Sequence, residues 1–202
     1  MFNETLKKIK PSEKDYKDIL NIKKEVFNFL KKYDVFLGGS AGKDTFLKGS
    51  HDLDFFVYLD NPSNSVDFFN DLKSFFSNVE IKKGSRDYYG CSYGKYQLEF
   101  IPVKKISFAE EAENITDVSS LHVDYVKKFN LQDEIRLAKY WLKLNHLYGA
   151  ESYIGGLSGH VTEILVIHAG SFEKFIELCK GFKSGIVIDP LNYYNPKLIK
   201  FC

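Results

Sequence analysis

Two motifs that could carry out chemistry lie close together in the first quarter of the chain. Residues 38–40 read Gly-Gly-Ser directly after an apolar run, and Asp52 and Asp54 open a second apolar stretch. Glycines let a backbone approach a ligand closely, and its N–H groups can then cradle phosphate oxygens. Two neighbouring carboxylates repel each other unless a cation lies between them, and hard divalent ions take oxygen ligands. The pair of motifs therefore predicts a site for metal-assisted phosphoryl transfer.

This chemistry requires a strand that holds the two aspartates side by side. Residues 53–59 are short, aromatic and β-branched, and a turn at Asn61-Pro62 closes them, which predicts a buried strand. Side chains at i and i+2 of a strand share a face, so Asp52 and Asp54 should project together. Each motif alone is weak evidence, because most Asp-x-Asp pairs are solvated and most Gly-Gly-Ser stretches are ordinary turns. The combination is much stronger.

A third carboxylate, Glu99, lies in a predicted strand segment at 93–103. Leu98 and Phe100 alternate with it, so its strand could lie beside the aspartate strand and bring the three acids together. The other interpretation is a carboxylate at a strand edge.

The remaining pattern divides the chain into an α/β half, residues 1–110, and a mainly helical half, residues 111–202. In the first half the spacing of apolar residues and turn signals predicts helices at 12–32, 44–47 and 65–77, strands at 35–37 and 79–82, and a polar turn at 84–90. In the second half it predicts helical segments at 121–129, 133–147 and 158–178.

Composition is that of an ordinary globular protein. The 202 residues are 44% hydrophobic and 27% charged, with a net charge of +1, which argues against a strongly basic nucleic-acid surface. The cysteines, three in number, are far apart and suggest neither a disulfide framework nor a zinc site: Cys91, Cys179 and Cys202. The N-terminus has no apolar signal core, and no stretch approaches the ~18 apolar residues of a membrane span. We therefore expect a cytoplasmic protein with no membrane segment.

The motifs resemble those of the polymerase-β-like nucleotidyltransferases and, more closely, of the archaeal (class I) CCA-adding tRNA nucleotidyltransferases. The family motif is present as Gly39-Ser40, Thr45-Phe46-Leu47-Lys48-Gly49 and Asp52-Leu53-Asp54, and further similarity follows in family order at 96–102, 134–139, 148–151, 156–159, 168–172 and 188–190. The resemblance implies an α+β fold: a polymerase-β-like nucleotidyltransferase head domain, with a mixed sheet and helices, followed by a mainly helical domain.

The chain departs from the family in two respects. Glu99 stands where the third carboxylate is usually Asp, and the sequence stops where family members continue into domains that grip the tRNA. We therefore expect a minimal form that lacks the C-terminal domains. A homodimer or a partner chain would replace them.

The resemblance implies a Mg²⁺-dependent enzyme that adds CMP or AMP from CTP or ATP to the 3′ end of a tRNA or another RNA and releases pyrophosphate. By the same resemblance Asp52, Asp54 and Glu99 are catalytic and hold the metal, as two Mg²⁺ ions or Mn²⁺ in their place. The implied nucleotide-binding residues are Gly39, Ser40, Lys43, His122, Arg136, Lys139 and Tyr148.

Several alternatives remain open from the sequence. Lys43 could be a solvated lysine and Tyr148 a tyrosine at the edge of the core, whereas Arg136, inside an apolar-periodic helix, needs a buried carboxylate or phosphate. The function could instead be a nucleotidyltransferase of other specificity, either resembling the 2′-5′ oligoadenylate synthases or acting on a small molecule or a protein. A catalytically inactive module that binds RNA ends is the third alternative.

Overall fold

The computed structural model describes residues 2–183 and 186–190, and these divide into two compact units, 1–132 and 133–202. The sequence predicted a boundary between a catalytic and a helical domain at residue 110. The compact units are defined by contacts, so they do not test that functional boundary, which stays a prediction. By its contacts, helix α5 (Ser119–Lys127) belongs to the first unit, because it packs against the short helix α3 (Gly39–Gly42) and the 3₁₀ turn η2 (Ile115–Val118).

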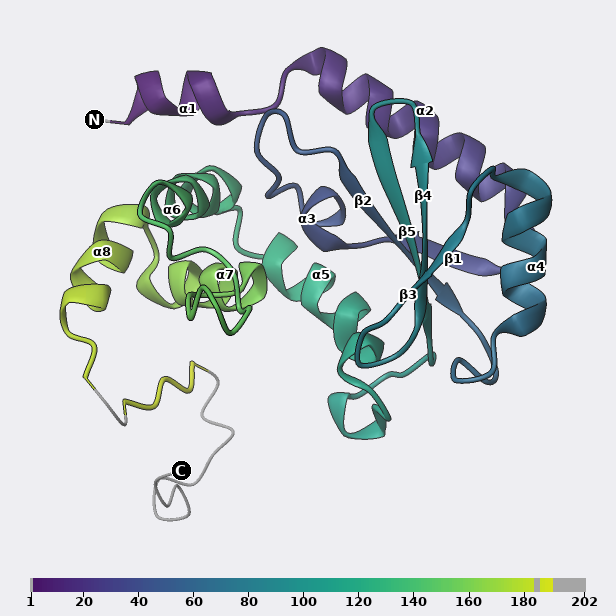
Figure 1. The fold of residues 1–202 in the computed structure, drawn as a ribbon. Helices are drawn as coiled ribbons and strands as arrows, with labels where there is room; N and C mark the ends of the chain where they lie inside the picture. Colours follow the sequence, from purple (N-terminus) through teal and green to yellow (C-terminus); the bar gives the residue numbers. More distant parts are fainter. Residues whose placement is uncertain (1, 184–185, 191–202) are drawn as a thin grey trace. The chain divides into compact units, whose positions relative to one another are not determined.

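The first unit is built around one mixed sheet of five strands in the order β1-β2-β5-β4-β3 (Figure 1). The strands are β1 (Asp34–Leu37), β2 (Asp52–Tyr58), β3 (Glu80–Lys82), β4 (Tyr88–Tyr93) and β5 (Tyr96–Val103). The central pair β2–β5 is parallel, and the other pairs are antiparallel. The remaining helical elements of this unit are α1 (Asn3–Ile9), α2 (Glu13–Phe29), α4 (Val66–Phe75) and the 3₁₀ turn η1 (Ala109–Glu111).

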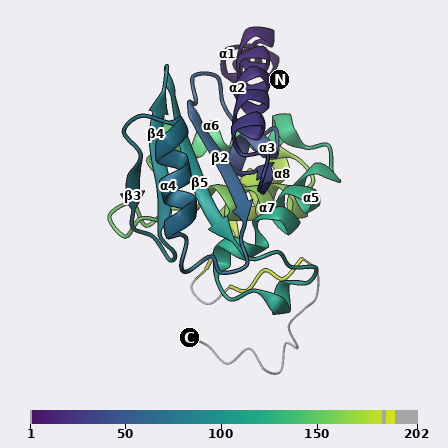
Figure 2. The same ribbon diagram turned by 90° about the vertical axis from the view of Figure 1, so that its right-hand side faces the viewer.

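Helices α2 and α4 cover one face of this sheet (Figures 1 and 2). Inward residues of both helices pack there on alternate residues of the central strands, and Phe55, Leu98 and Phe100 are fully buried. Because side chains alternate along a strand, the other face carries the opposite set, including Asp54, Phe56 and Glu99. One face of the sheet thus forms the core, and the other is available for chemistry.

The N-terminus of α2 shows how local sequence sets these boundaries. Ser12 Oγ accepts a hydrogen bond from the Asp15 N–H, and the Asp15 carboxylate accepts one from the Ser12 N–H. This reciprocal capping box satisfies N–H groups that a helix start leaves without intrahelical partners. The predicted helix start after Ser12 is confirmed.

Two local expectations are wrong. The short helix after the glycine turn begins at Gly39 instead of Asp44, because Asp44 has a positive φ of 57° that ends it. The turn predicted at 84–90 ends earlier, since β4 begins at Tyr88 and Tyr89 packs into the core with 5% exposure.

The second unit is helical in its described part, and a large part of its chain lies in three helices. They are α6 (Gln132–Leu144), α7 (Gly159–Ala169) and α8 (Phe172–Lys180). Serine side chains cap both later helices, at Ser158 and Ser171. The Glu134 carboxylate accepts the Phe172 N–H at 2.7 Å, which ties the start of α8 to α6.

The sequence predicted no disulfide framework and no membrane-spanning segment, and the described residues bear on both expectations. Cys91 and Cys179 are free thiols, and Cys202 lies outside those ranges. Within residues 2–183 and 186–190, no helix has the length and apolar character needed to cross a bilayer.

Candidate active site

The acidic residues of the first unit meet where β2 and β5 run side by side. In the parallel register Asp54 is paired with Glu99, and Asp52 with Gln97. Neighbouring strands lie about 4.8 Å apart, and paired residues point to the same face. Asp54 and Glu99 are therefore direct neighbours, and Asp52 lies one pleat further along on that face. The pairing agrees with the alternation around Glu99 in the sequence.

The two aspartates act electrostatically on Glu99. Burial raises the pKa of Glu99 above its usual range, and the charges of Asp54 and Asp52 raise it further, while Lys82 opposes them. Burial and the charges of Glu99 and Asp54 also raise the pKa of the neighbouring Tyr88 hydroxyl. This face of the sheet thus concentrates negative charge that a cation would relieve.

The glycine turn packs directly on Asp54. The Gly38 N–H donates to the Asp54 carbonyl at 2.8 Å. Gly39 has a φ of +54°, and a Cβ on it would lie 1.5 Å from Asp54 Oδ2. A Cβ on Gly38 would lie 2.4 Å from the ring of Phe56. A side chain at either position would thus have to displace Asp54 or Phe56, and the turn touches Asp54 as its sequence position suggested.

Two polar residues, Ser40 in the turn and Lys43 just after it, were predicted to bind the nucleotide. Ser40 is the second residue of α3, and its carbonyl accepts the Thr45 N–H at 2.9 Å. Lys43 is only 8% exposed, which argues against the interpretation of a solvated lysine. His122 lies on α5, half-buried, and the adjacent Val123 has its Cγ2 3.8 Å from the position of a Cβ on Gly42. The α5 helix therefore borders α3 beside the glycine turn.

The carboxylate oxygens of Asp52, Asp54 and Glu99 are the kind of ligand that a hard divalent ion takes. The three side chains do not, however, converge on one point where they could bind the same ion. Throughout the described ranges, no group of three or more His, Cys, Asp or Glu side chains is arranged to hold a metal ion. Asp54 and Glu99 are half-buried neighbours and Asp52 is exposed. Binding an ion through all three would thus require side-chain rotation on a fixed backbone register.

The predicted basic residues of the second unit are buried in ion pairs. Arg136 is 1% exposed, and its Nη1 donates to Asp133 Oδ1 at 2.6 Å, so it has a carboxylate partner, but the Asp133 side chain is 37% exposed and is not the buried partner that was predicted. Lys139 Nζ lies 2.7 Å from Glu163 Oε1, and this pair joins α6 to α7 with both side chains at most 4% exposed. Burial of these cations makes their pairing a structural requirement.

Tyr148 lies in the same unit next to that ion pair. Burial raises the pKa of its hydroxyl to about 12, and the charges of Glu163 and Glu151 contribute. A Cβ on Gly159 would lie 2.7 Å from the Tyr148 hydroxyl, so the Tyr148 side chain reaches the start of α7. Glu163 is thus the ion-pair partner of Lys139 and also lies near enough to Tyr148 for its charge to act on the hydroxyl.

The sequence model of the nucleotidyltransferase domain family matches residues 19–144, which include the glycine turn and all three carboxylates. The chain belongs to the nucleotidyltransferase domain family. A second model, tRNA nucleotidyltransferase, second domain, matches residues 133–201.

The curated relatives of this nucleotidyltransferase include archaeal CCA-adding enzymes. It is 33% identical to the CCA-adding enzyme of Nanoarchaeum equitans over 204 residues, which are 96% of this chain and 52% of the relative. For the CCA-adding enzymes of Sulfolobus acidocaldarius and Pyrococcus abyssi the identity is 32%, with 96% and 94% of this chain and 48% and 46% of the relative covered. The chain thus spans about half the length of the curated relatives it matches.

Solved structures support the fold of this nucleotidyltransferase. A Cid1 poly(U) polymerase bound to MgATP has a TM-score of 0.65 at 17% identity, over 82% of this chain and 53% of the other. A cytoplasmic RNA terminal U-transferase has a TM-score of 0.62 at 20% identity, over 82% and 50%. The predicted α+β fold, a polymerase-β-like head followed by a helical part, is confirmed.

Glu163, the ion-pair partner of Lys139, was not among the site residues predicted from the sequence. Glu163 is the single charged side chain in the apolar stretch 161–167, and an acid in such a stretch needs a buried partner. That signal could have pointed to Glu163, although the sequence offered no means of choosing Lys139 as its partner.

Proposed function

We propose that this chain transfers a nucleoside monophosphate from CTP or ATP to the 3′ end of a tRNA, so that it builds or repairs the CCA end. The observation that carries the proposal is the acidic pair Asp54–Glu99 in parallel register, with Gly39 packed on the Asp54 carboxylate. CCA addition is the activity in the names of its curated relatives.

In this proposal the 3′-oxygen of the RNA attacks the α-phosphorus of the NTP. The bond from that phosphorus to the β-phosphate bridging oxygen breaks, and pyrophosphate leaves. Asp52, Asp54 and Glu99 would hold Mg²⁺, as two ions or with Mn²⁺ in their place. Such ions, when bound, neutralise charge on the attacking and leaving oxygens. Glu99 assists removal of the proton from the 3′-hydroxyl.

Each unit by itself carries donors that we propose for nucleotide binding. In the first unit these are the backbone around Gly39, the Ser40 hydroxyl, Lys43 and His122. In the second unit they are Arg136, Lys139 and Tyr148. Cationic and N–H donors suit the oxygens of a triphosphate. Because the two basic residues of the second unit are already held by Asp133 and Glu163, their positions are set before a nucleotide arrives.

The acceptor and the assembly complete the proposal. The acceptor is a tRNA or another RNA with a free 3′ end, and a homodimer or a partner chain supplies the surfaces that hold the rest of it. The compartment is the cytoplasm, in keeping with the free thiols Cys91 and Cys179.

The test is incorporation of labelled nucleotide. The purified chain is incubated with Mg²⁺ and each of the four labelled NTPs, with tRNA that lacks all or part of its CCA end. We expect CMP to enter tRNA lacking CCA and AMP to enter tRNA ending in CC, and neither product to form with Asp54→Asn. Incorporation that persists in Asp54→Asn would overturn the assignment of the site, and incorporation of UMP alone would overturn the assignment of CCA addition.

A further inference from the structure

A cavity of about 550 Å³ opens in the first unit at the other end of β2 from the aspartates. Its walls come from the loop after β2, the start of α4, β3, the β3–β4 turn and the loop before η2. Among the strand residues that line it, Tyr89 is paired with Phe100 and so lies on the helix-covered face of the sheet, whereas Asp54 and Glu99 lie on the other face. The cavity is therefore distinct from the candidate active site.

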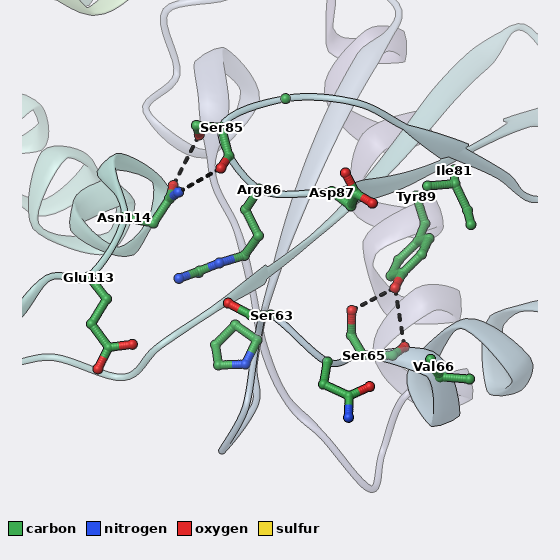
Figure 3. A pocket seen from close by; sticks show the side chains of 13 residues that line it. Ser63, Ser65, Val66, Ile81, Ser85, Arg86, Asp87, Tyr89, Glu113 and Asn114 are labelled. Atoms are coloured by element: carbon green, nitrogen blue, oxygen red, sulfur yellow. Dashed lines mark hydrogen bonds between the residues drawn. The ribbon is translucent and has the colours of Figure 1, made fainter.

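The two sides of the cavity differ in chemistry (Figure 3). Val66, Ile81 and Tyr89 lie on one side, and Val66 and Ile81 are 60% and 50% exposed. Arg86 and Asn114 lie on the other side. Val66 and Ile81 thus offer apolar surface to a ligand on one side, where the Tyr89 ring itself is 5% exposed, and the other side offers polar groups.

Arg86 is fixed in place and still has donors to spare. Its Nη1 donates to the Pro102 carbonyl at 3.1 Å and to Asp117 Oδ1 at 2.6 Å, and its Nη2 donates to Asp117 Oδ2 at 3.3 Å. A guanidinium carries five N–H groups. Among the residues that the structure describes, no acceptor is bound to the Arg86 Nε–H or to its second Nη2–H. A held guanidinium with free N–H groups suits a phosphate.

The acidic residues of the cavity do not exclude an anion, since each has a lysine beside it. Lys83 Nζ lies 2.6 Å from Asp87 Oδ2, and Lys104 Nζ lies 2.6 Å from Glu113 Oε1. Each charged residue that lines the cavity therefore has a partner of opposite charge, and for Arg86 that partner is Asp117.

The start of α4 adds further donors. Ser65 precedes the helix, but its Oγ pairs with the Tyr89 hydroxyl at 2.6 Å instead of capping the helix. The N–H groups of Val66 and Asp67 meet no acceptor in the described part of the chain. Helix N-termini favour acceptor-rich and anionic groups.

We propose that this cavity binds a nucleoside phosphate, with the phosphate toward Arg86 and the base against Val66 and Ile81. Its volume lies within the range of about 300–1,000 Å³ that is typical of small-molecule sites. The ligand is a free mononucleotide or one nucleotide of a single-stranded RNA, and both present the same chemistry. This second nucleotide site is independent of the transfer reaction proposed above.

Amide chemical shifts of the full ¹⁵N-labelled chain test the proposal. CMP, cytidine, inorganic phosphate and the trinucleotide CpCpC are titrated separately, and the amides of 63–66 and 84–87 are followed. We expect saturable shifts with CMP or CpCpC, and cytidine and phosphate at least about tenfold weaker, a difference of ~1.4 kcal/mol. The tighter of CMP and CpCpC identifies the source. The absence of saturable shifts at these amides, or equal binding of cytidine, would overturn the proposal.

A pair of variants gives a second measurement that does not depend on Arg86, whose loss could unfold the chain. Val66→Glu adds a carboxylate to the cavity at the first position of α4, where helices tolerate acids. Leu20→Glu is the control, because Leu20 is 49% exposed on α2 and outside the cavity. We expect Val66→Glu to weaken CMP binding at the 63–66 and 84–87 amides about tenfold, and Leu20→Glu to leave it unchanged. Equal affinity in the two variants would contradict the site, whatever the result of the transfer assay.

Discussion

The carboxylate of Asp54 occupies the space that a side chain at position 39 would need, because a Cβ on Gly39 would lie 1.5 Å from Asp54 Oδ2. The Gly-Gly-Ser turn and the Asp-x-Asp motif are therefore packed against each other. The turn can approach the acidic residue only because residue 39 has no side chain and adopts a φ of +54°. Any group bound by the backbone of this turn would lie next to that carboxylate.

Substitution at position 39 should therefore disrupt the site beyond its cost to the backbone. Gly39→Ala and Gly49→Ala both place a side chain at positive φ, which costs roughly 1–2 kcal/mol. Only Gly39→Ala adds a clash, since nothing lies within 4 Å of a Cβ on Gly49. We expect a loss of nucleotide incorporation of about 10²-fold or more for Gly39→Ala, as for a misplaced reacting group, and a small loss for Gly49→Ala. Urea unfolding and the incorporation assay measure both effects, and equal activities would contradict the packing argument.

Nucleotide incorporation should depend on the charge of the side chain at position 99 more than on its length. Glu99→Asp keeps the charge on the same strand face, whereas Glu99→Gln keeps the size and removes the charge. We expect Glu99→Asp to retain incorporation within about tenfold and Glu99→Gln to lose about 10³-fold, the scale of removing one electrostatic group from a transition state. The measurement is single-turnover CMP incorporation at saturating CTP. An active Glu99→Gln variant would show that this carboxylate is a bystander.

The Lys139–Glu163 pair should contribute strongly to the stability of the second unit. Removing one member of a buried pair leaves an uncompensated charge and costs about 3–5 kcal/mol, which we expect for Glu163→Gln. The double variant Lys139→Met/Glu163→Leu should recover the free energy of unfolding, because it removes both charges, but it should not recover CTP binding.

The matched control for that pair is Glu177→Gln, which breaks the exposed pair Lys180–Glu177 on α8. We expect no measurable change in the free energy of unfolding, because solvent screens exposed pairs. Full CTP affinity in the double variant would show that Lys139 has only a structural role.

Acid sensitivity should depend on Asp117. Burial by itself raises the pKa of this carboxyl, but Arg86 and the N–H groups of Lys104 and Asn114 outweigh burial, and the pKa of Asp117 is lowered. A group whose pKa is lowered by folding stabilises the protein above its unfolded pKa of about 3.9 and loses that contribution as pH falls through the folded value. Stability should thus fall below about pH 4 in the wild type.

Asp117→Asn tests this dependence. We expect the variant to be less stable at pH 7, because Arg86 keeps its charge without a partner. Its unfolding free energy should then change less between pH 5 and pH 3 than that of the wild type. Thermal or urea unfolding at several pH values measures the slope, and identical slopes in the two proteins would show that Asp117 does not carry the acid sensitivity.

Local patterns predicted the elements that carry the acidic residues, and contacts between distant residues decided the rest. Alternation along 52–58 and 96–103 predicted which side chains share a face with Asp54 and with Glu99, whereas the parallel pairing of the two strands and its register came from the structure. The end of α3 depended on a positive φ at Asp44, which side-chain periodicity does not show. The Lys139–Glu163 pair joins two helices, and the packing of those helices selected it. The start of β4 at Tyr88 depended on Tyr89 finding space in the core.

The most direct test of the central claim is the location of a bound divalent ion. Mn²⁺ is added to the ¹⁵N-labelled chain, and paramagnetic broadening of amide signals is mapped in the wild type, in Asp54→Asn and in the control Asp60→Asn, an exposed acid beyond the other end of β2. We expect broadening centred on residues 38–40, 52–54 and 97–99 that persists in Asp60→Asn and disappears in Asp54→Asn. Broadening centred elsewhere, or unchanged by Asp54→Asn, would contradict the account.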